Sequence, residues 1–134
     1  MSNHWLLKTE PSAYSWSDLE REKNAVWDGV TNPVALKHIA AMKPGDDALI
    51  YHTGEERAVV GLARVTKAAY QDPKANDAKL LVVELAPVKR VARPVTLADI
   101  KADPMFQESP LVRQGRLSVV SLNDEQFQRL TKGA

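Results

Sequence analysis

The sequence predicts an α+β domain that is mainly β, built as a small twisted or closed sheet with short helices at its ends. Roughly five strand-like segments rich in Val, Leu and Ile follow one another along the chain. Short segments that open with helix-capping residues separate them. Helices that cover both ends of such a sheet leave one mouth, where several strand ends meet. Polar residues at strand ends are therefore the first candidates for function.

Composition narrows the classes of function. The length of 134 residues favours one domain over residues 1–134. A net charge of +1 excludes the broad basic face of a protein that coats polyanions, so any nucleic-acid contact should be local. The chain has no cysteine and three histidines far apart in the sequence, so we expect neither a metal nor a cofactor. No apolar run reaches the roughly 18–20 residues of a membrane span, which predicts a cytoplasmic protein that does not contact a membrane. We expect a monomer.

The first strand should cover residues 3–9 and end before Glu10-Pro11, because proline cannot extend a strand ladder. Lys8, Thr9 and Glu10 then emerge at its end. Taken alone, these three residues are equally typical of a solvated strand terminus with an ion pair.

A short helix should follow, capped by Ser15 with Asp18 and reaching about residue 23. Of the three tryptophans, Trp5 and Trp16 are predicted to be packing residues.

The segment 27–33 combines an aromatic ring, a turn and a helix start. Asp28-Gly29 favours a tight turn, Asn32 suits the N-cap, and Pro33 suits the first helical position. The free N–H groups and positive dipole of this helix, which should run to about residue 42, would face the same volume as the Trp27 ring. Such a surface could hold a base, a nucleotide or another planar polar ligand. The alternative is that Trp27 belongs to the core.

Two strands are predicted in the middle of the chain. The strand at 48–53 ends in Tyr51, His52 and Thr53, just before a turn, and the strand at 58–66 contains Gly61 as a bulge or a point of close approach. A lone histidine such as His52 is more often structural than catalytic.

A polar loop should span residues 70–77, and a further strand should span 79–88. The cluster Lys89, Arg90 and Arg93 is interpreted as a solvated strand edge, with phosphate contact as the alternative.

The last third of the chain predicts a short capped helix from Thr96, a turn over residues 113–116, a strand over 117–122 and a final helix over 124–132. The planar forks of Arg113 and Arg116 suit phosphate. The structural alternative is that one of them pairs with Asp28 or Glu10.

With these elements in order, the chain resembles the EVE domain family of the PUA-like superfamily, which is related to YTH domains. The matching segments are WLLKTEP (5–11), VWDGVTN (26–32), MKPGD (42–46), YH (51–52), VGLA (60–63), YQDP (70–73) and LVRQGRLSV (111–119). They follow the family's order over nearly the whole chain. Two departures are Thr31, where the family usually has arginine, and the short loop before Leu80.

The resemblance implies a PUA-like β-barrel with a pocket for a nucleobase, a modified one, flipped out of DNA or RNA. The positions carried over are Lys8, Thr9, Glu10, Trp27, Asn32, Tyr51, His52, Thr53, Arg113, Gly115, Arg116 and Ser118. A base on an aromatic face recovers about 1–3 kcal/mol. Thr9, Asn32 and Ser118 could supply hydrogen-bond partners for its Watson–Crick edge.

The leading hypothesis is a non-catalytic module that binds nucleic acid and reads a modified base. A second hypothesis is an enzyme acting on a small molecule or nucleotide, with His52 as acid or base beside Glu10 or Asp28. The sequence offers no Ser-His-Asp order and no Gly-rich phosphate loop for such chemistry. A third hypothesis is a protein interaction module with a vestigial pocket.

Overall fold

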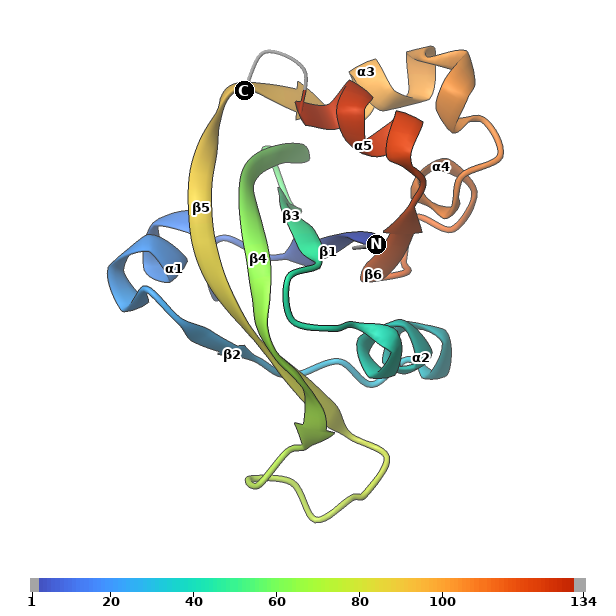
Figure 1. Ribbon diagram of the computed structural model, residues 1–134. Helices are drawn as coiled ribbons and strands as arrows, with labels where there is room; N and C mark the ends of the chain where they lie inside the picture. The colour runs from blue at the N-terminus through green and yellow to red at the C-terminus, as the bar shows by residue number, and fades with distance from the viewer. Residues whose placement is uncertain (1–2, 132–134) are drawn as a thin grey trace.

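The computed structural model describes residues 3–131, which form one six-stranded sheet in the order β2-β5-β4-β3-β1-β6 (Figure 1). The strands are β1 (His4–Thr9), β2 (Ala25–Trp27), β3 (Asp47–His52), β4 (Ala58–Gln71), β5 (Leu81–Thr96) and β6 (Val119–Leu122). The helices are α1 (Trp16–Glu22), α2 (Pro33–Ala41), α3 (Leu97–Ala102), the 3₁₀ helix η1 (Pro104–Phe106), α4 (Pro110–Arg113) and α5 (Asp124–Thr131). β1 runs parallel to β3, and the other neighbouring strands are antiparallel.

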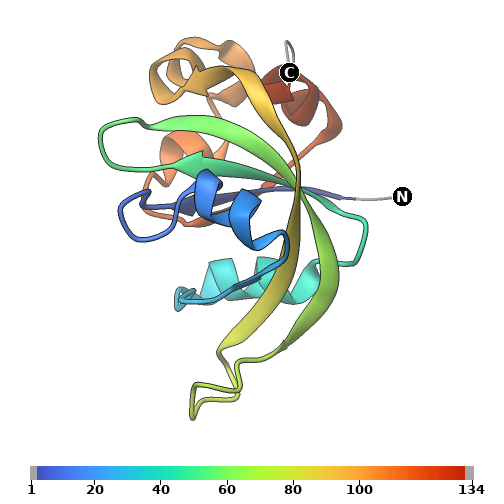
Figure 2. The same cartoon turned by 90° about the vertical axis from the view of Figure 1, so that its left-hand side faces the viewer.

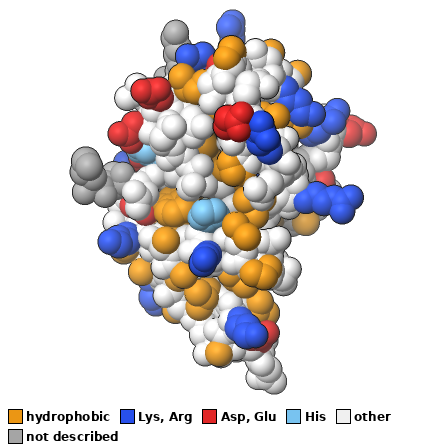
Figure 3. All heavy atoms as spheres, turned by 90° about the vertical axis from the view of Figure 1, so that its right-hand side faces the viewer, with side chains coloured by type: hydrophobic (Ala, Val, Ile, Leu, Met, Phe, Trp, Pro, Cys, Tyr) orange, Lys and Arg blue, Asp and Glu red, His pale blue; other side chains and the backbone are white. Residues whose placement is uncertain are grey.

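The predicted fold class is confirmed. The long strands β4 and β5 curve strongly, so that the sheet wraps around its core with short helices packed at its ends (Figure 2). On the face that includes α2 and β6, basic side chains are scattered among acidic and apolar ones (Figure 3). This distribution agrees with the near-neutral net charge.

Three elements were not predicted, and one of them is the 3₁₀ helix η1, which Asp103 caps. β2 has only three residues, too few for an alternating pattern, and exists because Ala25 and Trp27 pair with Leu85 and Val83 of β5. The helix α4 begins at Pro110 behind the capping hydroxyl of Ser109 and precedes the predicted turn at 113–116.

β4 and β5 are longer than predicted. Tyr70 pairs with Val82, so the polar loop begins after Gln71 rather than at residue 70. β5 continues past Pro87, which pairs with Ala63 where the register shifts, a position that tolerates proline. The basic cluster therefore lies inside a strand. Its Arg90 pairs with Glu20 of α1 at 2.6 Å, which supports the solvated interpretation of the cluster.

Gly61 lets α1 pack against the sheet. The register of β3 with β4 and of β4 with β5 shifts beside this residue, as the predicted bulge requires. Trp16 is fully buried, and a Cβ atom at Gly61 would lie 2.5 Å from its ring. Only a residue without a side chain permits this contact.

Asp46 joins the start of β1 to the end of the connection that follows α2. Its buried carboxylate accepts hydrogen bonds from Trp5 Nε1, from the backbone N–H of Asn3 and from that of Lys43, each at 3.0 Å. Burial opposes ionisation, but these hydrogen bonds outweigh it and hold the pKa of Asp46 below its ordinary value.

Substitution of Gly61 tests the packing of Trp16. Gly61→Ala should lower the free energy of unfolding by about 1–3 kcal/mol, because the new methyl group forces the Trp16 ring out of place. Gly115→Ala is the matched control, since no atom lies within 4 Å of its Cβ position, and it should change stability by less than about 0.5 kcal/mol. Urea denaturation measures both, and equal stabilities of the two variants would contradict the assignment.

The lowered pKa of Asp46 predicts acid sensitivity. A depressed folded-state pKa contributes stability that is complete above the unfolded value of about 4 and is lost as the pH falls through the folded value. Asp46→Asn should therefore be less stable than wild type at pH 7, and the difference should shrink below pH ~4. The exposed Glu55→Gln variant serves as control and should retain the wild-type dependence. A constant difference between Asp46→Asn and wild type over this range would refute the prediction.

Candidate functional site

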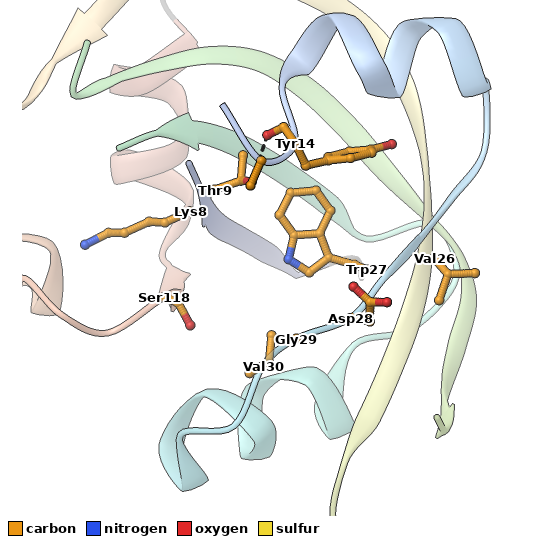
Figure 4. A pocket seen from close by; sticks show the side chains of 10 residues that line it. Lys8, Thr9, Tyr14, Val26, Trp27, Asp28, Gly29, Val30 and Ser118 are labelled. Carbon is orange, nitrogen blue, oxygen red and sulfur yellow. Dashed lines mark hydrogen bonds between the residues drawn. The ribbon is translucent and has the colours of Figure 1, made fainter. Parts of the chain in front are cut away.

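A cavity of about 370 Å³ lies where the end of β2, at one edge of the sheet, meets the end of β1 and the start of β6 near the other edge (Figure 4). Its lining residues are Lys8, Thr9, Ala13, Tyr14, Val26, Trp27, Asp28, Gly29, Val30 and Ser118. They come from the end of β1, the loop to α1, the end of β2 with the turn after it, and the residue before β6. We name it the Trp27 cavity. It lies where strand ends meet, as the sequence predicts for the mouth of the sheet.

Trp27 forms one wall of the cavity. Its side chain is 7% exposed and meets Tyr14 edge to face, with ring centroids 5.9 Å apart. Burial raises the pKa of Tyr14 far above its ordinary value, so the neighbouring ring is an uncharged phenol. The indole nitrogen lies on the side that faces Lys8 and Ser118 (Figure 4), and no partner for it occurs within residues 3–131. Trp27 thus packs against the core and offers a free donor.

Lys8, Thr9 and Ser118 form the opposite side. The Lys8 backbone N–H donates to the Ser118 carbonyl at 2.9 Å, and its ammonium donates to the Gly115 carbonyl at 3.0 Å. Burial lowers the pKa of Lys8. The Thr9 hydroxyl donates to the Tyr14 carbonyl at 2.8 Å, whereas the Ser118 hydroxyl has no hydrogen-bond partner among the described residues. The available donors are therefore Ser118, Trp27 and the remaining ammonium protons of Lys8.

The N-terminus of α2 differs from the sequence prediction in one respect. Asn32 is the N-cap and Pro33 occupies the first turn, as predicted. However, Asn32 Oδ1 accepts from the N–H groups of Val34 and Ala35, and its carbonyl accepts from that of Leu36. Proline has no N–H group, so every backbone N–H of the first turn of α2 already has an acceptor on Asn32. The expectation of free amides facing Trp27 was therefore wrong.

A second cavity, of about 350 Å³, holds four more predicted residues. It is lined by Asn32, Val34, Arg113, Gln114, Gly115, Arg116 and Leu117. The guanidinium of Arg113 donates to the Gln107 carbonyl and pairs with Glu108, both at 3.0 Å. The expected alternative pairing with Asp28 or Glu10 therefore does not occur for Arg113. Arg116 is exposed and makes no ion pair with any residue from 3 to 131.

The end of β3 lies to one side of the Trp27 cavity. Tyr51 and Thr53 line a small hollow of about 150 Å³ together with Lys8 and Gly115, and the Lys8 ammonium lies 5.5 Å from the Tyr51 ring centroid. Glu10, which lines none of these cavities, accepts from the Thr53 hydroxyl at 3.3 Å.

His52 also lines none of the three cavities. It is 7% exposed, and its Nε2 accepts from the Trp16 N–H at 3.0 Å while Nδ1 lies 2.7 Å from Glu56. Both ring nitrogens are engaged in holding α1 and the turn after β3. This arrangement agrees with a structural histidine.

Six lining residues of the Trp27 cavity were not predicted: Ala13, Tyr14, Val26, Asp28, Gly29 and Val30. Val26 of β2 and the three residues after β2 are sequence neighbours of Trp27, so proximity could have identified them. Tyr14 approaches Trp27 only through the tertiary fold. No group of three or more His, Asp or Glu side chains suited to a metal occurs among residues 3–131. Nor does any helix of this part of the chain have the length and apolar character needed to cross a membrane.

Comparisons with known proteins agree with the architecture. The family model described as "EVE domain" matches residues 3–133. Mouse thymocyte nuclear protein 1 is 30% identical over 95% of this chain and 71% of its own length. A crystal structure of a protein from Agrobacterium tumefaciens has a TM-score of 0.93 at 34% identity, covering 98% of this chain and 92% of that one.

The human thymocyte nuclear protein 1 has been solved in complex with DNA containing 5-methylcytosine. That structure has a TM-score of 0.85 at 28% identity, covering 97% of this chain and 96% of its own.

The two bonds of His52 predict a stability role that is separable from ligand binding. His52→Ala should lower the free energy of unfolding by about 1–3 kcal/mol, because the buried Trp16 N–H loses its acceptor. Glu56→Ala removes only the more exposed partner and should cost less than about 1 kcal/mol. Neither variant should alter ligand affinity at the Trp27 cavity by more than about twofold. Urea denaturation measures the stabilities and binding titrations measure the affinities. A large loss of affinity in His52→Ala without a loss of stability would show that His52 contributes to binding.

Proposed function

The chain belongs to the EVE domain family, and from this premise we propose that it is a non-catalytic nucleic-acid-binding module that reads a modified, flipped nucleobase in the Trp27 cavity. The observation that carries the proposal is the cavity itself, with a tryptophan wall and unused donors on its other side. Its volume of about 370 Å³ falls within the range of small-ligand sites, which speaks against a vestigial pocket. The human relative in complex with 5-methylcytosine-containing DNA supports the same class of ligand.

The chemistry of the lining suits a base with both an amino group and ring acceptors. The Trp27 N–H and the Ser118 hydroxyl can donate to ring nitrogen or carbonyl acceptors, and the Asp28 carboxylate at the rim can accept from an exocyclic amine. Cytosine, adenine and guanine present this combination, whereas thymine and uracil lack the amino group. Trp27 supplies an apolar surface for the ring, on the order of 1–3 kcal/mol for a stacked base.

The departure at Thr31 lies outside the cavity. Thr31 is exposed and is not a lining residue of the Trp27 cavity. The lining of this cavity in the present chain contains Lys8 as its one cation. The proposal therefore rests on Trp27, Ser118 and Lys8.

Oligonucleotides bearing modified and plain bases test the proposal. Wild type should bind oligonucleotides with 5-methylcytosine or methylated adenine, at low salt, more tightly than plain ones. Trp27→Ala should weaken that binding about 5- to 150-fold, the equivalent of 1–3 kcal/mol of stacking. Fluorescence anisotropy measures the affinities, and thermal unfolding verifies that the variant is folded.

Because Trp27 is also buried, a milder pair of variants separates binding from stability. Trp27→Phe keeps an aromatic ring and removes the free N–H, so it should weaken binding. Trp5→Phe removes an equally buried indole whose N–H is bonded to Asp46, so it should lower stability and leave affinity unchanged. Wild type that binds neither modified nor plain oligonucleotides, or a Trp27→Phe variant that binds as tightly as wild type, would refute the base-reading proposal.

A further inference from the structure

The second cavity lies next to the Trp27 cavity, and residues adjacent in sequence line the two. Val30 and Ser118 line the first, whereas Asn32 and Leu117, on the same two segments, line the second. Lys8 lines the first cavity, and its ammonium is bonded to the carbonyl of Gly115, which lines the second. The two cavities are therefore neighbours along these segments, close enough for one nucleic-acid strand to reach both.

Arg116 is the available cation of the second cavity. The Arg113 guanidinium is engaged by the Gln107 carbonyl and by Glu108, whereas Arg116 has no ion-pair partner within the described chain. The lining contains no acidic residue. The first turn of α2, which begins beside this cavity, also contains none. The charged residues that line this cavity are therefore both cationic, although the whole chain is close to neutral.

Neutral donors add to this cation. Asn32 uses its side-chain oxygen as the helix cap, which leaves its amide NH₂ group as a donor. Gln114 contributes a second side-chain amide to the lining. A guanidinium fork with adjacent amide donors is a combination that binds phosphate oxygens.

We infer that the second cavity binds a phosphate of the nucleic-acid strand whose base occupies the Trp27 cavity, with Arg116 as its cationic partner. This inference rests on the proposed function, because a base in the first cavity is what brings the strand to the second. It assigns different tasks to the two arginines of the turn: Arg116 contacts phosphate, and Arg113 holds the turn to residues 107 and 108. The ligand is therefore a nucleotide within a strand, and a free base fills only half of the site.

The test compares Arg116→Ala with Arg93→Ala. Arg93 is an exposed arginine of β5 that lines none of the cavities described above, so its variant makes the same change in net charge. The ligands are a modified deoxynucleoside, its 5′-monophosphate, and oligonucleotides with and without the modification, titrated from low to physiological salt.

Arg116→Ala should weaken binding of modified and plain oligonucleotides by the same several-fold factor. It should also reduce the slope of log K against log salt by about one, as expected for the loss of one phosphate contact. Nucleoside binding should stay unchanged. An equal loss with the monophosphate assigns the cavity to the 5′-phosphate of the bound nucleotide itself, and a loss only with oligonucleotides assigns it to a neighbouring phosphate.

An Arg116→Ala slope equal to that of Arg93→Ala overturns the inference, even if modified bases are still preferred. Conversely, an Arg116-dependent slope without any preference for modified bases retains the phosphate site and refutes base reading. Absence of oligonucleotide binding by wild type overturns both.

Discussion

β1 is the element that the site depends on. It is hydrogen-bonded on both sides, to β3 in parallel and to β6 in antiparallel register, and Trp5, Leu6 and Leu7 are buried. Both ladders continue to its last residues: the Lys8 N–H bonds to the Ser118 carbonyl, and the Thr53 N–H bonds to the Thr9 carbonyl, each at 2.9 Å. The polar end of β1 is therefore fixed against two other segments before any ligand arrives, which is the preorganisation that a binding site requires.

The parallel pairing of β1 with β3 also explains where the rest of the site comes from. Parallel neighbours cannot be joined by a tight turn and need a long crossover connection. In this chain the crossover covers residues 10–46 and contains α1, β2 and α2. Tyr14, Trp27 and Asn32 all lie on it, so the connection that the sheet requires supplies the aromatic wall facing Lys8 and Ser118. Its closing end is held by Asp46, whose carboxylate bonds to Trp5 of β1.

Local chemistry could be predicted from the sequence because it depends on neighbours along the chain. The caps at Ser15, Asn32 and Thr96 are satisfied within three residues, and all three were predicted. β2, the contact of Tyr14 with Trp27 and the different partners of Arg113 and Arg116 depend on residues far away or on the exact course of a turn. The start of α2 is a further example. The sequence identifies Asn32 as the cap, but it does not show that all N–H groups of the first turn are already hydrogen-bonded to Asn32.

Under the proposed function, the two cavities have different roles: the second cavity contributes affinity for the strand, and the Trp27 cavity discriminates between bases. The second cavity contains Arg116, which can contact any strand, because phosphate carries no sequence information. The Trp27 cavity, apart from Lys8 and Asp28, presents neutral groups that distinguish one base from another. With a net charge of +1, and with Arg116 the one arginine of the second cavity that has no ion-pair partner among the described residues, the electrostatic contribution to binding is small and only weakly dependent on salt. Binding to unmodified strands is then weak, and selectivity depends on the few donors around Trp27 that the fold leaves without partners.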